Sequence, residues 1–187
     1  MPAKRTALLC AAIATTCLAT FIVSPLCMLA VASEQPKPES TIPEAGKVDA
    51  QAAFEKVKSL AGKWAGKTAH GDGSLEFRIT AAGSAVAETM WPGSPYEMVN
   101  MYSIDGGELF LVHYCGMGNQ PRMKLIAVEG DTLKFSAVSV ANKSGPDASY
   151  MHSLDLTIAG DTIKEKWGHL AEGKVETHAE FELKKQQ

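Results

Sequence analysis

From residue 64 to residue 183, hydrophobic and polar side chains alternate along much of the chain. Leu75, Phe77 and Ile79 alternate with polar neighbours, and the same pattern recurs over 122–127 and 174–183. A period of two is typical of strands with one dry face and one wet face. Turn-forming residues such as Gly130-Asp131 separate the runs. The pattern predicts strands near residues 63–68, 75–80, 85–91, 96–104, 108–115, 122–128, 132–140, 150–158, 162–169 and 174–183.

Short strands joined by tight turns form a meander, and a long meander must hide its two edge strands. We therefore predict an all-β fold, a closed antiparallel meander barrel of about 8–10 strands with one short N-terminal helix. Asp49 is suited to cap that helix, because Phe54, Val57 and Leu60 follow it at helical spacing. Gly62 is placed to end the helix as a C′ glycine.

The N-terminus has the features of an export signal. Lys4 and Arg5 precede an apolar run that ends in Ala30-Val31-Ala32, which predicts a signal peptide over residues 1–32 and a periplasmic or secreted protein. An uncleaved membrane anchor is the alternative, because the run approaches the roughly 20 residues that span a bilayer. Residues 33–48 contain Pro36, Pro38 and Pro43 and predict a flexible linker, which leaves residues 49–187 for the barrel.

Charge and cysteine content limit the partners and the covalent structure. Cleavage would remove Lys4 and Arg5 from 18 basic residues and none of the 21 acidic ones, so the mature chain would have 16 against 21. This acidic balance argues against nucleic acid as a partner, and we expect membrane contact only with an uncleaved signal. Cys115 alone of the four cysteines would remain, which excludes an intramolecular disulfide. The oligomeric state stays open.

The segment Leu60-Ala61-Gly62-Lys63-Trp64-Ala65-Gly66 resembles the Gly-x-Trp signature that opens the first strand of lipocalins and other calycins. The resemblance covers residues 49–183 and implies a barrel with a helix plugging one end and Trp64 packed across the bottom. The strand number is more similar to that of fatty-acid-binding proteins or nitrobindin-type barrels. The sequence has neither a lipocalin disulfide nor an alignable proximal haem histidine, so the resemblance implies no particular ligand.

A second resemblance concerns the segment HYCGMGNQPRM, residues 113–123, which is similar to a pattern in bacterial exported proteins of unknown function. Its loop, 115–122, is rich in glycine and in amide and guanidinium donors, which suit a carbonyl or carboxylate group. We therefore predict a small apolar or amphipathic molecule in the barrel lumen, with its polar end fixed at the mouth. The candidate ligand-binding residues are His113, Cys115, Asn119, Gln120, Arg122, His152 and Glu165.

Strand alternation assigns a direction to two of these side chains. His152 shares parity with Leu154 and Leu156, and Glu165 shares parity with Trp167, so both are expected to face the interior. A buried carboxylate without a partner is costly. We therefore expect Arg122 or a histidine to pair with the Glu165 carboxylate.

Other functions remain open at this point. Cys115 with His113 or His152 as base would make a nucleophilic enzyme. The same three residues are also possible ligands of a metal, and a histidine could hold haem, although the sequence assigns neither a metal nor any other cofactor. An interaction module with a filled core is the third class. In a purely structural reading, Asn119 and Arg122 close their own loop and His152 is hydrogen-bonded within the core.

Overall fold

A computed structural model describes residues 48–68 and 71–187. The predicted signal peptide and all of the predicted linker except residue 48 lie outside the described residues. One helix, α1 (Ala50–Ser59), precedes ten strands. The strands are β1 (Gly62–Thr68), β2 (Gly71–Thr80), β3 (Ala85–Met90), β4 (Met98–Asp105), β5 (Glu108–Tyr114), β6 (Gln120–Glu129), β7 (Thr132–Ala141), β8 (Tyr150–Ala159), β9 (Thr162–Ala171) and β10 (Lys174–Lys185), and a short 3-10 helix (Ala81–Gly83) joins β2 to β3.

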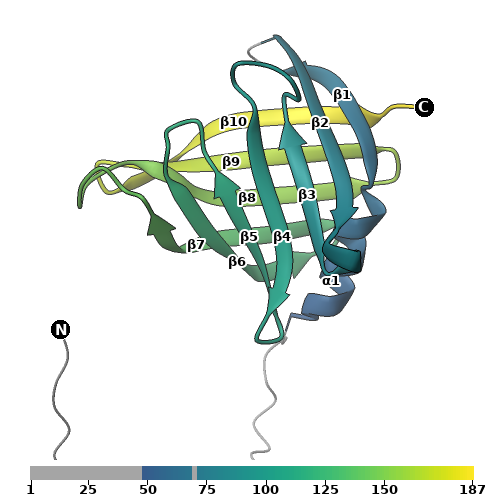
Figure 1. Cartoon of the computed structure of the whole chain (residues 1–187), viewed down its shortest axis with the longest axis horizontal. Coiled ribbons are helices and arrows are strands. Elements are labelled where there is room, and N and C mark those ends of the chain that lie inside the picture. The colour runs from purple at the N-terminus through teal and green to yellow at the C-terminus, as the bar shows by residue number, and fades with distance from the viewer. Residues whose placement is uncertain (1–47, 69–70) are drawn as a thin grey trace, which may run out of the picture. The chain divides into compact units, whose positions relative to one another are not determined.

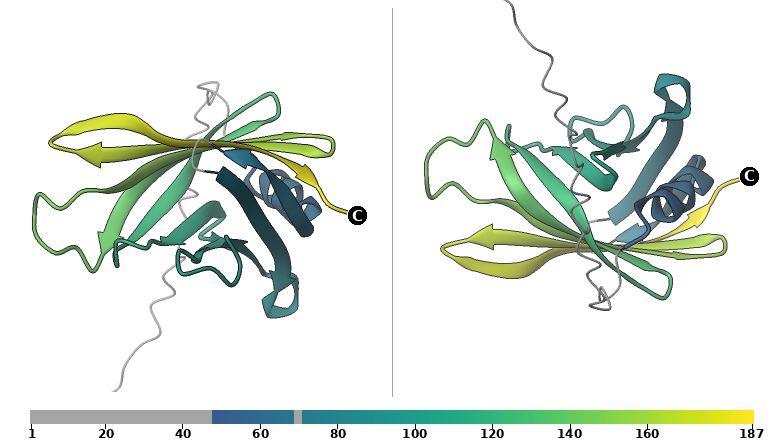
Figure 2. Two further views of the ribbon diagram at one scale, coloured as in Figure 1. Left: turned by 90° about the horizontal axis from the view of Figure 1, so that it is seen from above. Right: turned by 90° about the horizontal axis from the view of Figure 1, so that it is seen from below.

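The ten strands form a closed antiparallel meander (Figure 1). Each strand pairs with its neighbours in sequence, and β1 closes the barrel by pairing with β10, for example Trp64 with Lys185. Viewed along the other directions, the strands curve around a common interior (Figure 2). The predicted fold class and all ten strands are confirmed, and the strand bounds differ from the prediction by a few residues at most sites.

Helix α1 closes one end of the barrel (Figure 1). The Asp49 carboxylate accepts a hydrogen bond from the Ala52 amide at 2.9 Å, as expected of an N-cap. The C-cap of the helix is Leu60, so the C′ position is residue 61, and Gly62 is already the first residue of β1. The prediction of Gly62 as the C′ glycine is therefore wrong by one residue. Gly62 has φ +130°, a conformation that glycine adopts readily at this sharp change of direction. No helix among the described residues has the length and apolar content needed to cross a membrane.

The core beneath α1 is apolar and well packed. Phe54 and Val57 of the helix and Trp64 of β1 are at most 3 % exposed. The Trp64 Nε1 donates a hydrogen bond of 2.8 Å to the Leu60 carbonyl, so the indole is buried with its polar atom satisfied. The interior at this end of the barrel is therefore filled by apolar side chains.

Candidate functional site

A cluster of polar side chains lies buried among the apolar residues of the barrel interior. Its members are 0–1 % exposed and come from β3, β4, β5 and β9. Each belongs to the inward face of its strand; Glu88, for example, alternates with the buried Val86 and Met90. The cluster consists of Glu88, Asn100, Tyr102, His113 and Glu165.

Three of these residues form a hydrogen-bonded row across neighbouring strands. Asn100 stands opposite Glu88 on one side and His113 on the other in the strand register. The Asn100 Nδ2 donates to Glu88 Oε2 at 2.9 Å, and the Asn100 Oδ1 lies 2.7 Å from His113 Nδ1. The Tyr102 hydroxyl donates to the same Glu88 oxygen at 2.7 Å. The row thus links a carboxyl group to one nitrogen of a buried imidazole.

Glu165 reaches the cluster from β9, on the opposite wall of the barrel. Its Oε2 accepts a hydrogen bond of 2.8 Å from Trp167 Nε1, and its carboxyl group interacts with that of Glu88. Burial raises the pKa of Glu165 well above its usual value, and the nearby Glu88 charge raises it further. Burial also raises the pKa of Glu88, but the hydrogen bonds from Asn100 and Tyr102 oppose this effect. Glu165 is therefore the more readily protonated member of the pair.

The expectation that Arg122 or a histidine would pair with the Glu165 carboxylate is therefore wrong. The partners are an indole and a second carboxyl group. Glu88 Oε1 and Glu165 Oε1 have no donor among the described residues when both groups are counted as acceptors. One proton on Glu165 provides the missing donor, because a protonated carboxyl group carries an O–H.

Next to His113 lies a small cavity of about 110 Å³. It is bordered by the ends of β3 and β5 and by the start of β4, so it lies at the end of the barrel opposite α1 and the β4–β5 turn. Its walls are thioether, aromatic and aliphatic groups together with two imidazoles. The lining residues are Met90, Trp91, Met98, His113, Met151, Trp167, His178, Ala179 and Phe181.

His113 is the polar group at the inner end of this cavity. Its ring lies 4.8 Å from that of Trp167, and its side chain is 1 % exposed. Burial lowers the pKa of His113 to about 4, so the imidazole is neutral at pH 7. Among the described residues, the His113 Nε2 is buried and has no hydrogen-bond partner. A buried polar atom without a partner beside a cavity is suited to a ligand.

Three predicted site residues shape the turn between β5 and β6. The Cys115 amide donates to the Asn119 carbonyl at 3.2 Å, and Asn119 Nδ2 donates to the Ser149 carbonyl at 3.0 Å. Gln120 Nε2 donates to the Gly118 carbonyl at 2.9 Å. The side-chain amides of Asn119 and Gln120 therefore hold the turn and the neighbouring 142–149 loop in place. For Asn119 this agrees with the purely structural reading of the sequence.

Arg122 lies on the outer face of β6. Its guanidinium group contacts Asp105 at 2.5 Å and stacks over the Phe110 ring at 3.5 Å. Arg122 alternates with the buried Pro121 and Met123, so its side chain points away from the cavity. It belongs to neither the interior cluster nor the cavity lining.

His152 does not face the interior, and this expectation from alternation is wrong. A β-bulge between Met151 and Ser153 inserts an extra residue, so that Met151 and Leu154 are both buried although they are three residues apart. His152 Nε2 instead lies 3.4 Å from Ser136 Oγ, on the face opposite the inward Phe135. The bulge also explains Gly168, where an added Cβ would lie 2.3 Å from Ser153 Oγ.

The seven predicted residues therefore do not meet at one place. His113 and Glu165 belong to the interior cluster and are joined through Trp167, whereas the other five hold a turn or lie outside the barrel. Sequence reasoning missed Glu88, Asn100 and Tyr102. The available signal was their alternation with apolar residues, which places all three on inward faces.

The enzyme and metal alternatives find limited support in this geometry. Burial raises the pKa of the Cys115 thiol, which opposes the thiolate that a nucleophile requires. Among the described residues, the imidazole of His113 is hydrogen-bonded to Asn100 and not to Cys115. Over residues 48–68 and 71–187, no group of three or more His, Cys, Asp or Glu side chains is arranged to hold a metal ion.

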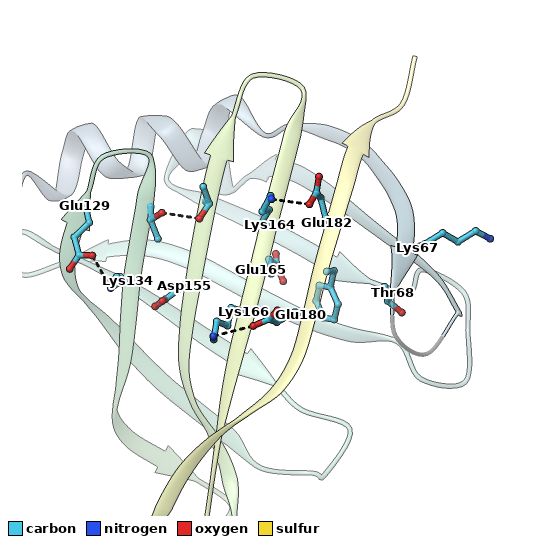
Figure 3. A pocket seen from close by; sticks show the side chains of 13 residues that line it. Lys67, Thr68, Glu129, Lys134, Asp155, Lys164, Glu165, Lys166, Glu180 and Glu182 are labelled. Atoms are coloured by element: carbon cyan, nitrogen blue, oxygen red, sulfur yellow. Dashed lines mark hydrogen bonds and ion pairs between the residues drawn. The ribbon is translucent and has the colours of Figure 1, made fainter.

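A separate hollow of about 620 Å³ lies on the outer face of β7–β10 (Figure 3). Its charged side chains are paired across strands: Lys164 with Glu182 at 2.9 Å, and Lys166 with Glu180 at 3.1 Å. The charges of these ion pairs compensate one another, and the pairs are largely exposed, as on an ordinary solvated sheet face.

Comparison of the chain with protein-family models and with curated protein sequences gave no match. The site must therefore be interpreted from its own geometry.

Proposed function

We propose that this chain is an exported small-molecule-binding protein that holds an apolar or amphipathic ligand in the cavity at the open end of the barrel. The observation that carries the proposal is the buried His113, which lines an otherwise mainly apolar cavity and whose Nε2 lacks a partner among the described residues. Ligand sites commonly combine apolar walls with very few oriented polar groups.

The walls suit a ligand of variable shape. Met90, Met98 and Met151 supply flexible, polarizable side chains that can adjust to an apolar surface. Trp91 and Phe181 pack edge to face with ring centroids 5.5 Å apart, which gives the cavity one firm aromatic wall. In this proposal the polar end of the ligand meets His113 rather than the predicted Arg122, Asn119 and His152.

Filling the cavity tests the proposal. Ala179 lines the cavity, so Ala179→Phe would occupy the space, whereas Val138→Phe adds the same ring at a position that is 53 % exposed. We expect the unmodified chain and Val138→Phe to enhance the fluorescence of Nile red, an uncharged apolar dye, and Ala179→Phe to lose that enhancement. Circular dichroism would establish that both variants fold.

Native mass spectrometry of the purified chain supplies a second measurement, with one bound molecule per chain as the expected result. Dye binding that survives in a folded Ala179→Phe variant would place the ligand elsewhere. A chain that neither retains a molecule nor binds the dye would contradict the proposal.

A further inference from the structure

We propose that the cavity selects uncharged, ring-sized molecules that donate one hydrogen bond, as phenols do, and that it rejects carboxylates. This inference rests on the proposed ligand-binding function and adds the chemical class of the ligand. It follows from how the interior cluster orients His113, from the size of the cavity and from the charges nearby.

The orientation begins at Glu88. One oxygen of its carboxyl group, Oε2, accepts hydrogen bonds from Tyr102 and from Asn100, at 2.7 and 2.9 Å. Because Oε2 accepts, the group of Asn100 that faces it must be the donor, the amide nitrogen. The Asn100 Oδ1 is thereby turned toward His113.

The orientation of Asn100 then fixes the protonation state of each imidazole nitrogen. Asn100 Oδ1 is an acceptor 2.7 Å from His113 Nδ1, so Nδ1 must carry the proton. A neutral imidazole has one N–H and one lone pair, which leaves the lone pair on Nε2. The lowered pKa of His113, about 4, agrees with this neutral form. The polar group offered to a ligand is therefore an acceptor, and its partner must be a donor.

The other buried donor at this wall is already engaged. Trp167 Nε1 donates to Glu165 at 2.8 Å and is not available to a ligand oxygen. Of the residues lining the cavity, His113 is the one that also has a buried, unpartnered polar atom, counting the described residues. A ligand with one donor on an apolar body matches this single acceptor.

The volume limits the size of the buried part. A cavity of about 110 Å³ is comparable to an engineered cavity of roughly 150 Å³ in another protein, which accepts benzene. The space therefore fits a single six-membered ring, and the rest of a larger ligand, such as Nile red, would lie outside the cavity.

Charge excludes carboxylates. A carboxylate would present only acceptors to the His113 lone pair, with the Glu88 carboxyl group on the far side of Asn100. It would also lose its hydration without gaining a hydrogen bond, which is costly. An ammonium group has donors for His113 but would likewise lose its hydration on entering the cavity. The Glu88 carboxyl group would not compensate for this loss, because Asn100 and Tyr102 already bind it.

Matched ring compounds test the inference on the unmodified chain. Phenol, anisole, benzoate and benzylamine would be titrated by calorimetry at pH 7. Anisole keeps the oxygen and the ring of phenol but has no O–H, so it would leave the buried His113 acceptor unsatisfied. We expect phenol to bind about tenfold or more tightly than anisole, and benzoate and benzylamine to bind more weakly than phenol.

Two further measurements locate the effect. In a folded His113→Phe variant, which keeps a ring but removes the acceptor, phenol and anisole should bind within about twofold of each other. Val138→Phe, at the exposed control position, should retain the phenol preference. Nitrogen-15 NMR should show the proton of His113 on Nδ1 in the unmodified chain, without any variant.

The outcomes separate this inference from the function on which it rests. Equal affinity for phenol and anisole, or a proton on His113 Nε2, would overturn donor selection while leaving ligand binding intact. Tighter binding of benzoate or benzylamine than of phenol would overturn the selection for uncharged ligands. If none of the ring compounds and no dye binds, both the inference and the proposed function fail.

Discussion

The two ends of the barrel each bury an aromatic side chain that carries a ring nitrogen, but they differ in whether that nitrogen has a hydrogen-bond partner. At the α1 end, the Trp64 indole is buried with its N–H bound to the Leu60 carbonyl, and the surrounding side chains are apolar. At the open end, the His113 imidazole is equally buried, but one of its nitrogens lacks a partner among the described residues. The first end is fully satisfied and stabilises the fold, whereas the second retains an unsatisfied group, and the proposed ligand binding rests on that group.

This difference extends to the distribution of buried polar atoms. Six such side-chain atoms lack hydrogen-bond partners among the described residues, and none of them belongs to α1, β1 or β2. Buried polar groups oppose folding unless they are satisfied. Their absence from α1, β1 and β2 leaves the plugged end without this cost, whereas the rest of the barrel interior carries it.

Truncating a tryptophan at each end should give the largest contrast. Trp64→Ala removes a fully buried ring and should lower the free energy of unfolding by about 3–5 kcal/mol. Trp91→Ala removes a half-buried ring that lines the cavity, so it should cost about 1 kcal/mol and weaken ligand binding. Urea denaturation and dye titration measure the two effects. Equal losses of stability would contradict the division between the two ends.

The carboxyl pair predicts a specific pH dependence. The pKa of Glu165 is well above 4.5 in the folded chain, so the folded state binds a proton that the unfolded state releases as pH rises. The stability that Glu165 contributes is complete below about pH 4.5 and is lost as pH increases toward its folded pKa. Relative to Glu165→Gln, the unmodified chain should lose about 1.4 kcal/mol per pH unit in that window.

The measurement is urea denaturation from pH 5 to pH 8 on both chains. Glu180→Gln is the matched control, because Glu180 is exposed and paired with Lys166 on the outer face. Parallel stability curves for the unmodified chain and Glu165→Gln would show that Glu165 is not protonated in the folded state.

Arg122→Ala should have the smallest effect. The ion pair with Asp105 is partly exposed, so its loss should cost about 0.5–1 kcal/mol. Because Arg122 points away from the cavity, ligand affinity should stay within about twofold of the unmodified chain. A large loss of affinity would restore Arg122 to the site predicted from the sequence.

Alternation along the chain predicted the barrel because it depends on a repeated pattern. Each run such as Leu75, Phe77 and Ile79 supports the same inference, so a one-residue error at a strand end changes little. Closure through β1 and β10 followed from the need to cover both edge strands.

The site was harder to predict because it depends on single residues. The bulge at Met151–Ser153 changes which side chain faces inward, and the local sequence does not reveal it. A second bulge, between Thr177 and Ala179, accompanies two consecutive residues, His178 and Ala179, that both line the cavity, which simple alternation does not predict. The partners of Glu165 could not be derived either, since Glu88 lies 77 positions earlier on the opposite wall.

The pairing of β1 with β10 has a consequence for biosynthesis. Trp64 near the start of the domain lies opposite Lys185, two residues before the end of the chain, so the seam joins its first and last strands. A nascent polypeptide cannot complete this seam until the residues of β10 have been synthesised. The barrel therefore stays open until its last strand pairs with its first.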